Sequence, residues 1–248
     1  MGTYVKITRD QIRNYYVTIM NEFNCNSVGL FASPVTKIRD IVGYEKVVDV
    51  WKEKLLDKVD FNQTSHSGYP LHIAREGLTN YYNHGSILDK FEELSELKQN
   101  LTDAANHVWQ EVLNYDSELI IVQSWLNESR TGAEQPFHNH GNSVFCGTLY
   151  VNIDTALVFE RQQLDAPGPI LMMKPNLNRP NSYGESYHYS HVSIPVETGS
   201  CLFWPSQLRH GYMNQKEELR LSLSFNMMPS RIDDFYTFNV ESVFTGTA

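Results

Sequence analysis

The sequence has little cysteine and no long apolar run. Its three cysteines, Cys25, Cys146 and Cys201, are too few and too scattered for a disulfide framework. No stretch approaches the roughly 18 consecutive apolar residues that can span a bilayer. The segment Met1–Lys6 also lacks the apolar core of a signal peptide. We therefore expect a protein of the reducing cytoplasm without a membrane partner.

Positive charge is also in short supply. Lysine and arginine together number 20 against 29 acidic residues, which gives a formal net charge of −9. Such a balance disfavours an extended phosphate-binding surface, so we expect no nucleic-acid partner. The 248 residues, 41% of them hydrophobic, are enough for one large β-rich domain or two small ones.

The first part of the chain has the hydrophobic spacing of helices. One helix is expected to begin near Asp10 and a second to cover residues 44–56. A third is expected over residues 87–115, with a break near Thr102, a residue type that favours helix N-termini. The polar stretch 62–85 contains glycine and histidine and indicates a loop with room for one strand.

From residue 118 the periodicity becomes that of strands. Short β-type runs separated by turn residues fall at 119–126, 143–152, 156–160, 192–195, 200–204 and 219–227. We expect a helix-rich supporting part over 1–117, a β core over 118–230 and a C-terminal extension over 231–248. A segment rich in Pro, Asn, Gly and Tyr, 162–189, interrupts the core as an insertion, either a lid over a substrate or a solvated loop.

The run 220–226 is the best local indication of a barrel. One face of the expected strand is polar and the other apolar, with Arg220, Ser222, Ser224 and Asn226 facing one way and Leu221, Leu223, Phe225 and Met227 the other. A strand on an outer surface could show the same alternation. The preceding His210 favours the interpretation that the polar face lines a binding cavity. The apolar face would then pack outward against the helices.

Three histidines could hold one metal ion. His138 and His140 are two positions apart, so they lie on the same side of an extended strand. A third ligand, His210, must come from a strand that is distant in sequence and adjacent in space, which a β-barrel provides. Three neutral imidazoles suit Fe, Zn, Cu or Ni. The alternative is that His138 and His140 are ordinary polar residues at a strand end.

Four motifs in order resemble the iron(II)/2-oxoglutarate-dependent oxygenases. They are QPFHNHGNS at 135–143, GTLYVN at 147–152, GSCLFWPS at 199–206 followed by His210, and RLSLSFN at 220–226. The chain is most similar to the prolyl-hydroxylase-like group common in bacteria and marine phages. The resemblance implies a mainly β fold with flanking helices. Its core would be a double-stranded β-helix, a cupin-like jelly-roll barrel with the α-rich N-terminal part packed on it.

The resemblance implies roles for particular residues. His138 and His210 match the two histidine ligands of the family, and His140 takes the place where most members have Asp or Glu. Arg220 and Ser222 match the pair that holds the distal carboxylate of 2-oxoglutarate; the planar arginine fork suits a carboxylate. Further candidates are Tyr150 and Asn226 for cofactor contact, and Trp125 and Asn127 for the substrate pocket. Core packing is an equally good interpretation of Trp125.

The implied activity is that of a hydroxylase that uses Fe(II), 2-oxoglutarate and O₂. It would hydroxylate an amino-acid, peptidyl or small-metabolite substrate and release succinate and CO₂. The histidine at position 140 supports a second hypothesis, a catalytically altered cupin-like protein that binds a metal or ligand. A third is a hydrolase that uses zinc-bound water and needs neither O₂ nor 2-oxoglutarate.

Overall fold

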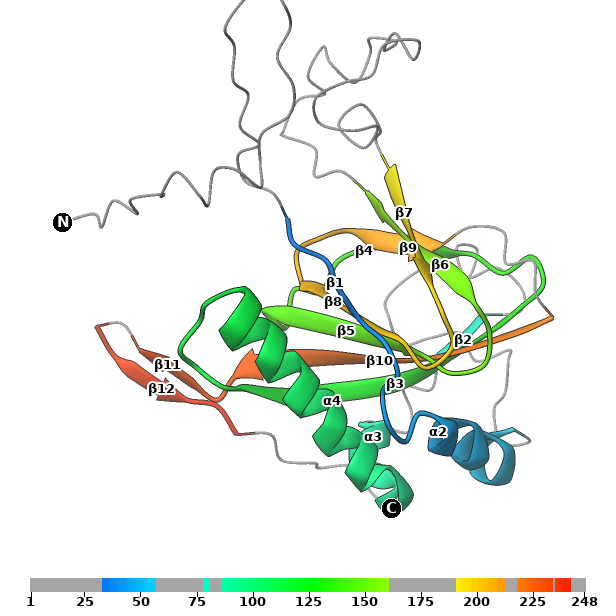
Figure 1. Cartoon of the computed structure of the whole chain (residues 1–248), viewed down its shortest axis with the longest axis horizontal. Helices are drawn as coiled ribbons and strands as arrows, with labels where there is room; N and C mark the ends of the chain where they lie inside the picture. The colour runs from blue at the N-terminus through cyan, green and yellow to red at the C-terminus, as the bar shows by residue number, and fades with distance from the viewer. Residues whose placement is uncertain are drawn as a thin grey trace, which may run out of the picture. The chain divides into compact units, whose positions relative to one another are not determined.

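Two antiparallel sheets face each other, and helices cover the outer face of the larger one (Figure 1). The computed structural model describes residues 33–56, 78–80, 86–160, 191–212, 218–233 and 235–241. The helix expected near Asp10 and the insertion at 162–189 lie outside these residues. The chain segments Pro34–Glu160 and Ser193–Ala248 belong to one compact unit.

The larger sheet has the strand order β1-β8-β5-β10-β3-β2. Its strands are β1 (Thr36–Ile38), β2 (Leu78–Asn80), β3 (Leu119–Arg130), β5 (Phe145–Tyr150), β8 (Cys201–Pro205) and β10 (Leu219–Pro229). Strands β3 and β10 pair along their whole length, with Arg220 opposite Ser129 and Asn226 opposite Gln123. The register shifts after Asn226, which marks a β-bulge. The sequence analysis allowed one strand within residues 62–85, and β2 lies in that stretch.

The smaller sheet has the order β4-β9-β6-β7 and brings two of the histidines together. It consists of β4 (Gln135–His138), β6 (Thr155–Glu160), β7 (His191–Val196) and β9 (His210–Tyr212). His138 lies opposite His210 across the β4–β9 pair. A Cβ atom added at Gly211 would lie 2.5 Å from the carbonyl oxygen of Gln135. Glycine at this position therefore allows β9 to lie close to β4.

The helices lie where the sequence predicts them, except for one boundary. They are α2 (Glu45–Val50) continued by the π-helical turn η1 (Trp51–Leu55), α3 (Ile87–Lys90), the 3₁₀ turn η3 (Glu92–Leu94), and α4 (Ser95–His107) continued by the π-helical turn η4 (Val108–Val112). The predicted break near Thr102 is wrong, because its hydroxyl donates to the Lys98 carbonyl within α4 at 2.8 Å. The helix is interrupted instead at Phe91, whose backbone is extended. None of the helices in the described ranges is long and apolar enough to cross a membrane.

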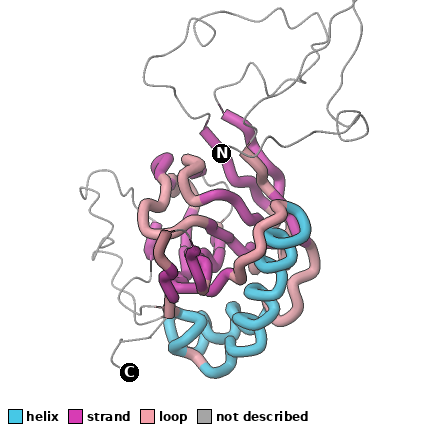
Figure 2. The backbone as a smooth tube through the Cα atoms, turned by 90° about the vertical axis from the view of Figure 1, so that its left-hand side faces the viewer, coloured by secondary structure: helices cyan, strands magenta, loops and turns pink. Residues whose placement is uncertain are grey.

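The main hydrophobic core lies between the helices and the larger sheet. Helix α4 runs across the outer face of β5, β10 and β3, and the helices gather on one side of the strands (Figures 1 and 2). This core joins the apolar face of β10 to the helices, with Leu221, Leu223, Phe225 and Met227 on the strand and Leu97, Leu101, Ala105 and Val108 among the helix residues. The prediction that this face of the strand packs outward against helices is confirmed.

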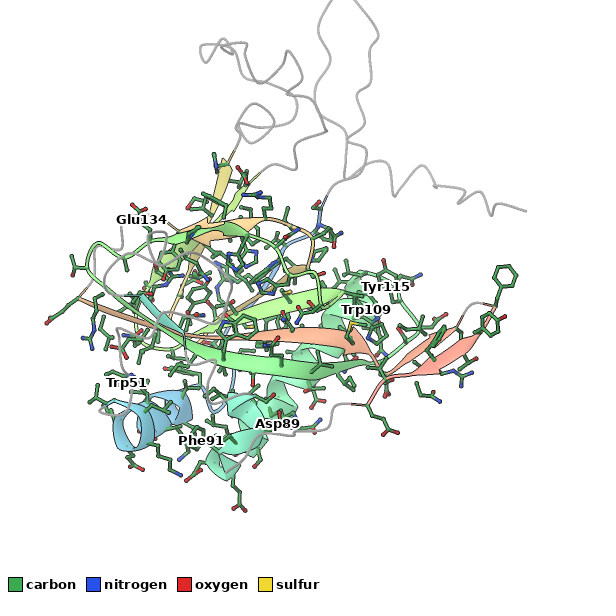
Figure 3. All side chains as sticks on the ribbon, turned by 180° about the vertical axis from the view of Figure 1, so that it is seen from behind. Trp51, Asp89, Phe91, Trp109, Tyr115 and Glu134 are labelled. Atoms are coloured by element: carbon green, nitrogen blue, oxygen red, sulfur yellow. The ribbon has the colours of Figure 1, made fainter. Side chains whose placement is uncertain are left out.

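Two tryptophans attach the helical layer to the sheet (Figure 3). The indole nitrogen of Trp51 donates to a carboxylate oxygen of Glu128 at 2.9 Å, and Glu128 is fully buried. The guanidinium of Arg130 pairs with the other carboxylate oxygen of Glu128. Trp109 contacts Phe145 of β5 with ring centroids 5.5 Å apart, and its other face stacks on Tyr115 at 3.9 Å. The outer face of the sheet is thus fixed by packing and by a satisfied buried carboxylate, which leaves the inner face for the site.

Candidate metal centre and cofactor pocket

His138, His140 and His210 lie together between the two sheets. Each offers one ligand atom, and these atoms all lie within 4.8 Å of one another. The ring centroids are 5.2 Å apart for His138 and His140, 4.5 Å for His138 and His210, and 5.0 Å for His140 and His210. The structure therefore brings together the three residues predicted from the sequence, and their arrangement can hold one divalent metal ion.

Each of the three rings is held through its Nδ1 atom by an oxygen acceptor. The contacts are His138 to the Pro136 carbonyl at 2.9 Å, His210 to the Leu208 carbonyl at 3.0 Å, and His140 to Oδ1 of Asn226 at 2.5 Å. Because a carbonyl or amide oxygen only accepts, each Nδ1 carries the hydrogen and each Nε2 keeps its lone pair. Metal-bound histidines are usually oriented in this way.

Burial keeps all three imidazoles neutral at neutral pH. Desolvation lowers the pKa of His138 and lowers the pKa of His210 well below its usual value. It also lowers the pKa of His140 to about 4, although the hydrogen bond with Asn226 acts in the opposite direction. A neutral imidazole is the form that binds a metal ion, so the three side chains are ready to ligate without losing a proton.

Arg220 lies on the inner face of β10 and is only 2% exposed. Its guanidinium lies over the ring of Tyr212, with Cζ 3.8 Å from the ring centroid, and 5.5 Å from that of Tyr150. Its Nε and Nη1 atoms have no hydrogen-bond partner within the described part of the chain. A buried charge without a partner is unfavourable, so this pocket fits a carboxylate ligand.

Ser222 and Tyr150 adjoin Arg220 on the inner face of the larger sheet. The register places Ser222 opposite Tyr150 on one side and opposite Asn127 on the other. The Tyr150 hydroxyl also has no hydrogen-bond partner among the residues that the structure describes. Burial raises its pKa, so the phenol keeps its proton and remains a donor. Two donors, a guanidinium and a phenol, therefore face the same buried space.

The residues predicted for the substrate pocket lie on β3. Asn127 donates from Nδ2 to the Ser224 hydroxyl at 3.1 Å, while no described residue bonds its Oδ1 atom. Trp125 is 4% exposed, and its ring centroid lies 5.5 Å from that of His140. Both side chains are therefore buried inside the barrel, Trp125 beside the third histidine.

The sequence did not single out Trp204, which lies on β8. Its ring makes an edge contact with His210, with centroids 4.7 Å apart, and with Phe159, with centroids 5.5 Å apart. These aromatic rings form one wall beside the histidine cluster. The run 201–204 is apolar throughout, so the sequence has no polar–apolar alternation there that could have indicated the inward position of Trp204.

A family model described as "Putative 2OG-Fe(II) oxygenase" matches residues 123–226, which include the three histidines and Arg220. This part of the chain is therefore similar to the 2OG-Fe(II) oxygenases. Iron(II) and 2-oxoglutarate, the cofactors predicted from the sequence, are those of this family, and O₂ and an organic substrate are the partners that the family implies. The donors described above fit both cofactors, with three imidazoles for the metal and a buried guanidinium for the dicarboxylate.

The chain is similar in structure to SnoN, a non-heme alpha ketoglutarate dependent epimerase from nogalamycin biosynthesis. The TM-score is 0.52 with 12% identity, over 80% of this chain and 79% of that chain. For SnoN in complex with Fe³⁺, alpha ketoglutarate and nogalamycin RO, the TM-score is 0.50 with 14% identity, over 80% of each chain. At such identities the likeness shows the fold. The predicted mainly β fold, a double-stranded β-helix with flanking helices, is confirmed.

Two further comparisons set the limits of this likeness. The chain spans 59% of the length of a 2OG-Fe(II) oxygenase family protein from Burkholderia pseudomallei, with 54% of this chain aligned, 11% identity and a TM-score of 0.38. No curated protein sequence matches the chain.

Proposed function

We propose that this protein is a 2OG-Fe(II) oxygenase that acts as a hydroxylase. It acts on an amino-acid, peptidyl or small-metabolite substrate and releases succinate and CO₂ from 2-oxoglutarate. In this proposal His138, His140 and His210 hold the iron. Arg220, with Ser222 and Tyr150 beside it, holds the distal carboxylate of 2-oxoglutarate. The observation that carries the proposal is the buried guanidinium of Arg220, two of whose nitrogen atoms have no partner among the described residues, on the larger sheet opposite the smaller sheet that bears His138 and His210.

The spacing along β9 supports one ligand between Arg220 and the metal. Tyr212, whose ring lies under the guanidinium, is two residues from His210 and therefore faces the same side of the strand. Two residues of an extended strand cover about 7 Å. A five-carbon diacid can bridge such a gap, with one end at Arg220 and the other near the histidines.

The protein's own groups would bind, orient and exclude water. When bound, iron and 2-oxoglutarate would activate O₂, the oxidant: one oxygen atom would enter the substrate as C–OH and the other would enter succinate as the keto acid loses CO₂. The three neutral imidazoles ligate, and the guanidinium fork orients the diacid. The buried rings of Trp204, Phe159 and Tyr212 keep water from the space around His210.

Anaerobic addition of Fe(II) and 2-oxoglutarate tests the proposed site. We expect a weak visible charge-transfer band and, under air, slow formation of succinate even without the substrate. If no band appears and no divalent metal supports 2-oxoglutarate binding, the proposal is wrong. Binding without any succinate from iron-loaded protein would instead identify a cupin-like binding protein. Activity that is independent of O₂ and 2-oxoglutarate would identify a zinc hydrolase.

The product distinguishes hydroxylation from other oxygenase reactions. Metabolites and peptides from a lysate are incubated with the iron-loaded protein, 2-oxoglutarate and O₂, and then compared by mass spectrometry. A hydroxylase adds one oxygen atom to its substrate. A product of unchanged mass with one inverted stereocentre would indicate an epimerase, the activity that SnoN is named for, and would contradict the proposed hydroxylation.

A further inference from the structure

Three amide side chains form a cluster behind His140. Asn226 donates from Nδ2 to Oε1 of Gln123 at 3.1 Å and to Oδ1 of Asn142 at 3.2 Å. Asn142 in turn donates from Nδ2 to Oε1 of Gln123 at 3.1 Å. Asn226 comes from β10, Gln123 from β3 and Asn142 from the turn between β4 and β5. The cluster therefore joins three separate segments at the β-bulge, and Asn226 at its centre is 2% exposed.

The cluster decides which atom of Asn226 faces the metal centre. Because Nδ2 is used by Gln123 and Asn142, Oδ1 points to His140, 2.5 Å from its Nδ1. The thiol of Cys146 lies 3.3 Å from the same oxygen and donates to it as well. Two acceptors would repel each other at this distance, so His140 carries its hydrogen on Nδ1. Its Nε2 is then left with a lone pair for a metal.

His140 differs from the other two histidines in what orients it. His138 and His210 each donate to the backbone carbonyl two residues earlier, so their orientation comes with the local strand. His140 depends on side chains instead: its Nδ1 bonds Asn226, 86 residues away in sequence, and lies 3.2 Å from the Cys146 thiol, a weaker partner. It is also the ligand that stands in place of the usual carboxylate. Substitution of a side chain can therefore change the orientation of His140. It cannot remove the backbone acceptors of His138 and His210.

We propose that Asn226 is a positioning residue for the metal centre. It fixes the ring and the tautomer of His140, and Gln123 and Asn142 hold it in the orientation that does so. This inference rests on the proposed function, because it takes His140 as a metal ligand. The sequence analysis predicted that Asn226 contacts 2-oxoglutarate. The present proposal gives Asn226 a different role, that of holding the ligand His140. A neutral amide accepts the Nδ1 hydrogen without adding a negative charge to the site, so the imidazole stays a neutral ligand.

The test compares two substitutions of Asn226 with a matched control. Asn226→Leu keeps the approximate volume and removes the acceptor, whereas Asn226→Asp keeps the acceptor. Asn152→Leu is the control, because Asn152 hydrogen-bonds the backbone of β10, at Leu219 and Leu221, rather than a histidine. Competition with a chelator measures the affinity for Co(II). We expect a loss of about 10- to 100-fold for Asn226→Leu and little change for Asn226→Asp and Asn152→Leu.

A proton NMR spectrum of the Co(II)-loaded protein distinguishes a change at one histidine from a general loss of structure. A ligated histidine whose Nδ1–H is held in a hydrogen bond gives a shifted, slowly exchanging signal. We expect three such signals from the wild type. Asn226→Leu should lose one of them by exchange with water, Asn226→Asp should shift the same one, and Asn152→Leu should keep all three in place.

Each outcome has a distinct meaning. Three signals that are unchanged in both Asn226 variants would overturn the positioning role and leave the proposed function intact. Only two signals in the wild type would show that His140 is not a ligand, and the ligand set of the proposed function would then be wrong. If Asn226→Leu does not fold, Asn226→Asp alone still decides, because it is nearly isosteric. A shift confined to one signal supports the inference, and no selective shift contradicts it.

Discussion

Replacing Arg220 by methionine separates binding of 2-oxoglutarate from binding of the metal. Methionine has a similar length and can still pack on the ring of Tyr212, but it carries no charge and no donor. Arg220 is 2% exposed, and two of its nitrogen atoms lack partners among the described residues. Loss of one partner of a buried charge pair costs about 2–4 kcal/mol. The dissociation constant for 2-oxoglutarate should therefore rise roughly 30- to 1,000-fold.

Calorimetric titration of 2-oxoglutarate into the metal-loaded protein without O₂ measures this loss. The affinity for the metal, measured separately, should be unchanged in Arg220→Met because Arg220 is not a ligand. Arg220→Lys should bind with intermediate affinity, since it keeps the charge and loses the planar fork. His210→Ala should show the reverse order, with metal binding lost first. If Arg220→Met binds 2-oxoglutarate as tightly as the wild type, Arg220 is only a structural residue of the barrel.

Arg220→Met should weaken 2-oxoglutarate binding, but it should not destabilise the protein when 2-oxoglutarate is absent. An unpaired buried charge destabilises the fold, so its removal should leave the free energy of unfolding of Arg220→Met equal to or above that of the wild type. Saturation with 2-oxoglutarate at 100 times its dissociation constant should then stabilise the wild type by about 2.7 kcal/mol and the variant hardly at all. Urea unfolding with and without 2-oxoglutarate measures both. A large loss of stability in the unliganded variant would contradict the unsatisfied state of this side chain.

Three further predictions concern the histidines and the helical layer. Burial lowers the pKa of His140 from 6.5 to about 4, so the unfolded chain takes up a proton first as the pH falls. Between pH 7.5 and pH 5 the metal-free fold should therefore lose roughly 2 kcal/mol of stability through this residue. Urea unfolding at pH 7.5 and pH 5 measures the loss, and a flat profile would refute it. Gly211→Ala should push β9 from β4, because a Cβ there lies 2.5 Å from a backbone oxygen of β4. Its metal affinity should fall, whereas Gly141→Ala, with no atom within 4 Å of the added carbon, should keep it. Trp51→Phe removes the donor to Glu128 and should cost about 1–3 kcal/mol of stability with unchanged metal affinity, and equal urea midpoints would argue against that hydrogen bond.

Short-range periodicity explains how much of the site was predictable. Side chains two residues apart share a face of a strand, so the sequence alone placed Arg220 and Ser222 together. It also placed His138 beside His140, but β4 ends at His138 and His140 lies just beyond the strand. The structure keeps both pairs on the inner side of the barrel. The polar and apolar faces of β10 were predictable for the same reason, because the alternation extends over seven residues.

Contacts between distant strands depend on register, which periodicity does not determine. Asn226 was expected on the inner face, and it is there, but its partner Gln123 lies opposite only because of the register of β3 and β10 at the bulge. The helix boundary at Phe91 escaped prediction for a related reason. Thr102 can either cap a helix or bond back to the fourth preceding carbonyl, and the packing of Leu101 and Ala105 on the sheet favours the second.

The two faces of the larger sheet divide stability from function. The outer face carries the main core and the satisfied carboxylate of Glu128, so it supplies the packing that holds β3, β5 and β10 in register. The inner face carries polar atoms that no described residue satisfies, on Arg220, Tyr150 and Asn127. Each of them costs stability until a ligand arrives. The core between the sheet and the helices offsets the stability lost to these unsatisfied atoms. Residues on the inner face can therefore be substituted, and the ligand they bind changed, without loss of the fold.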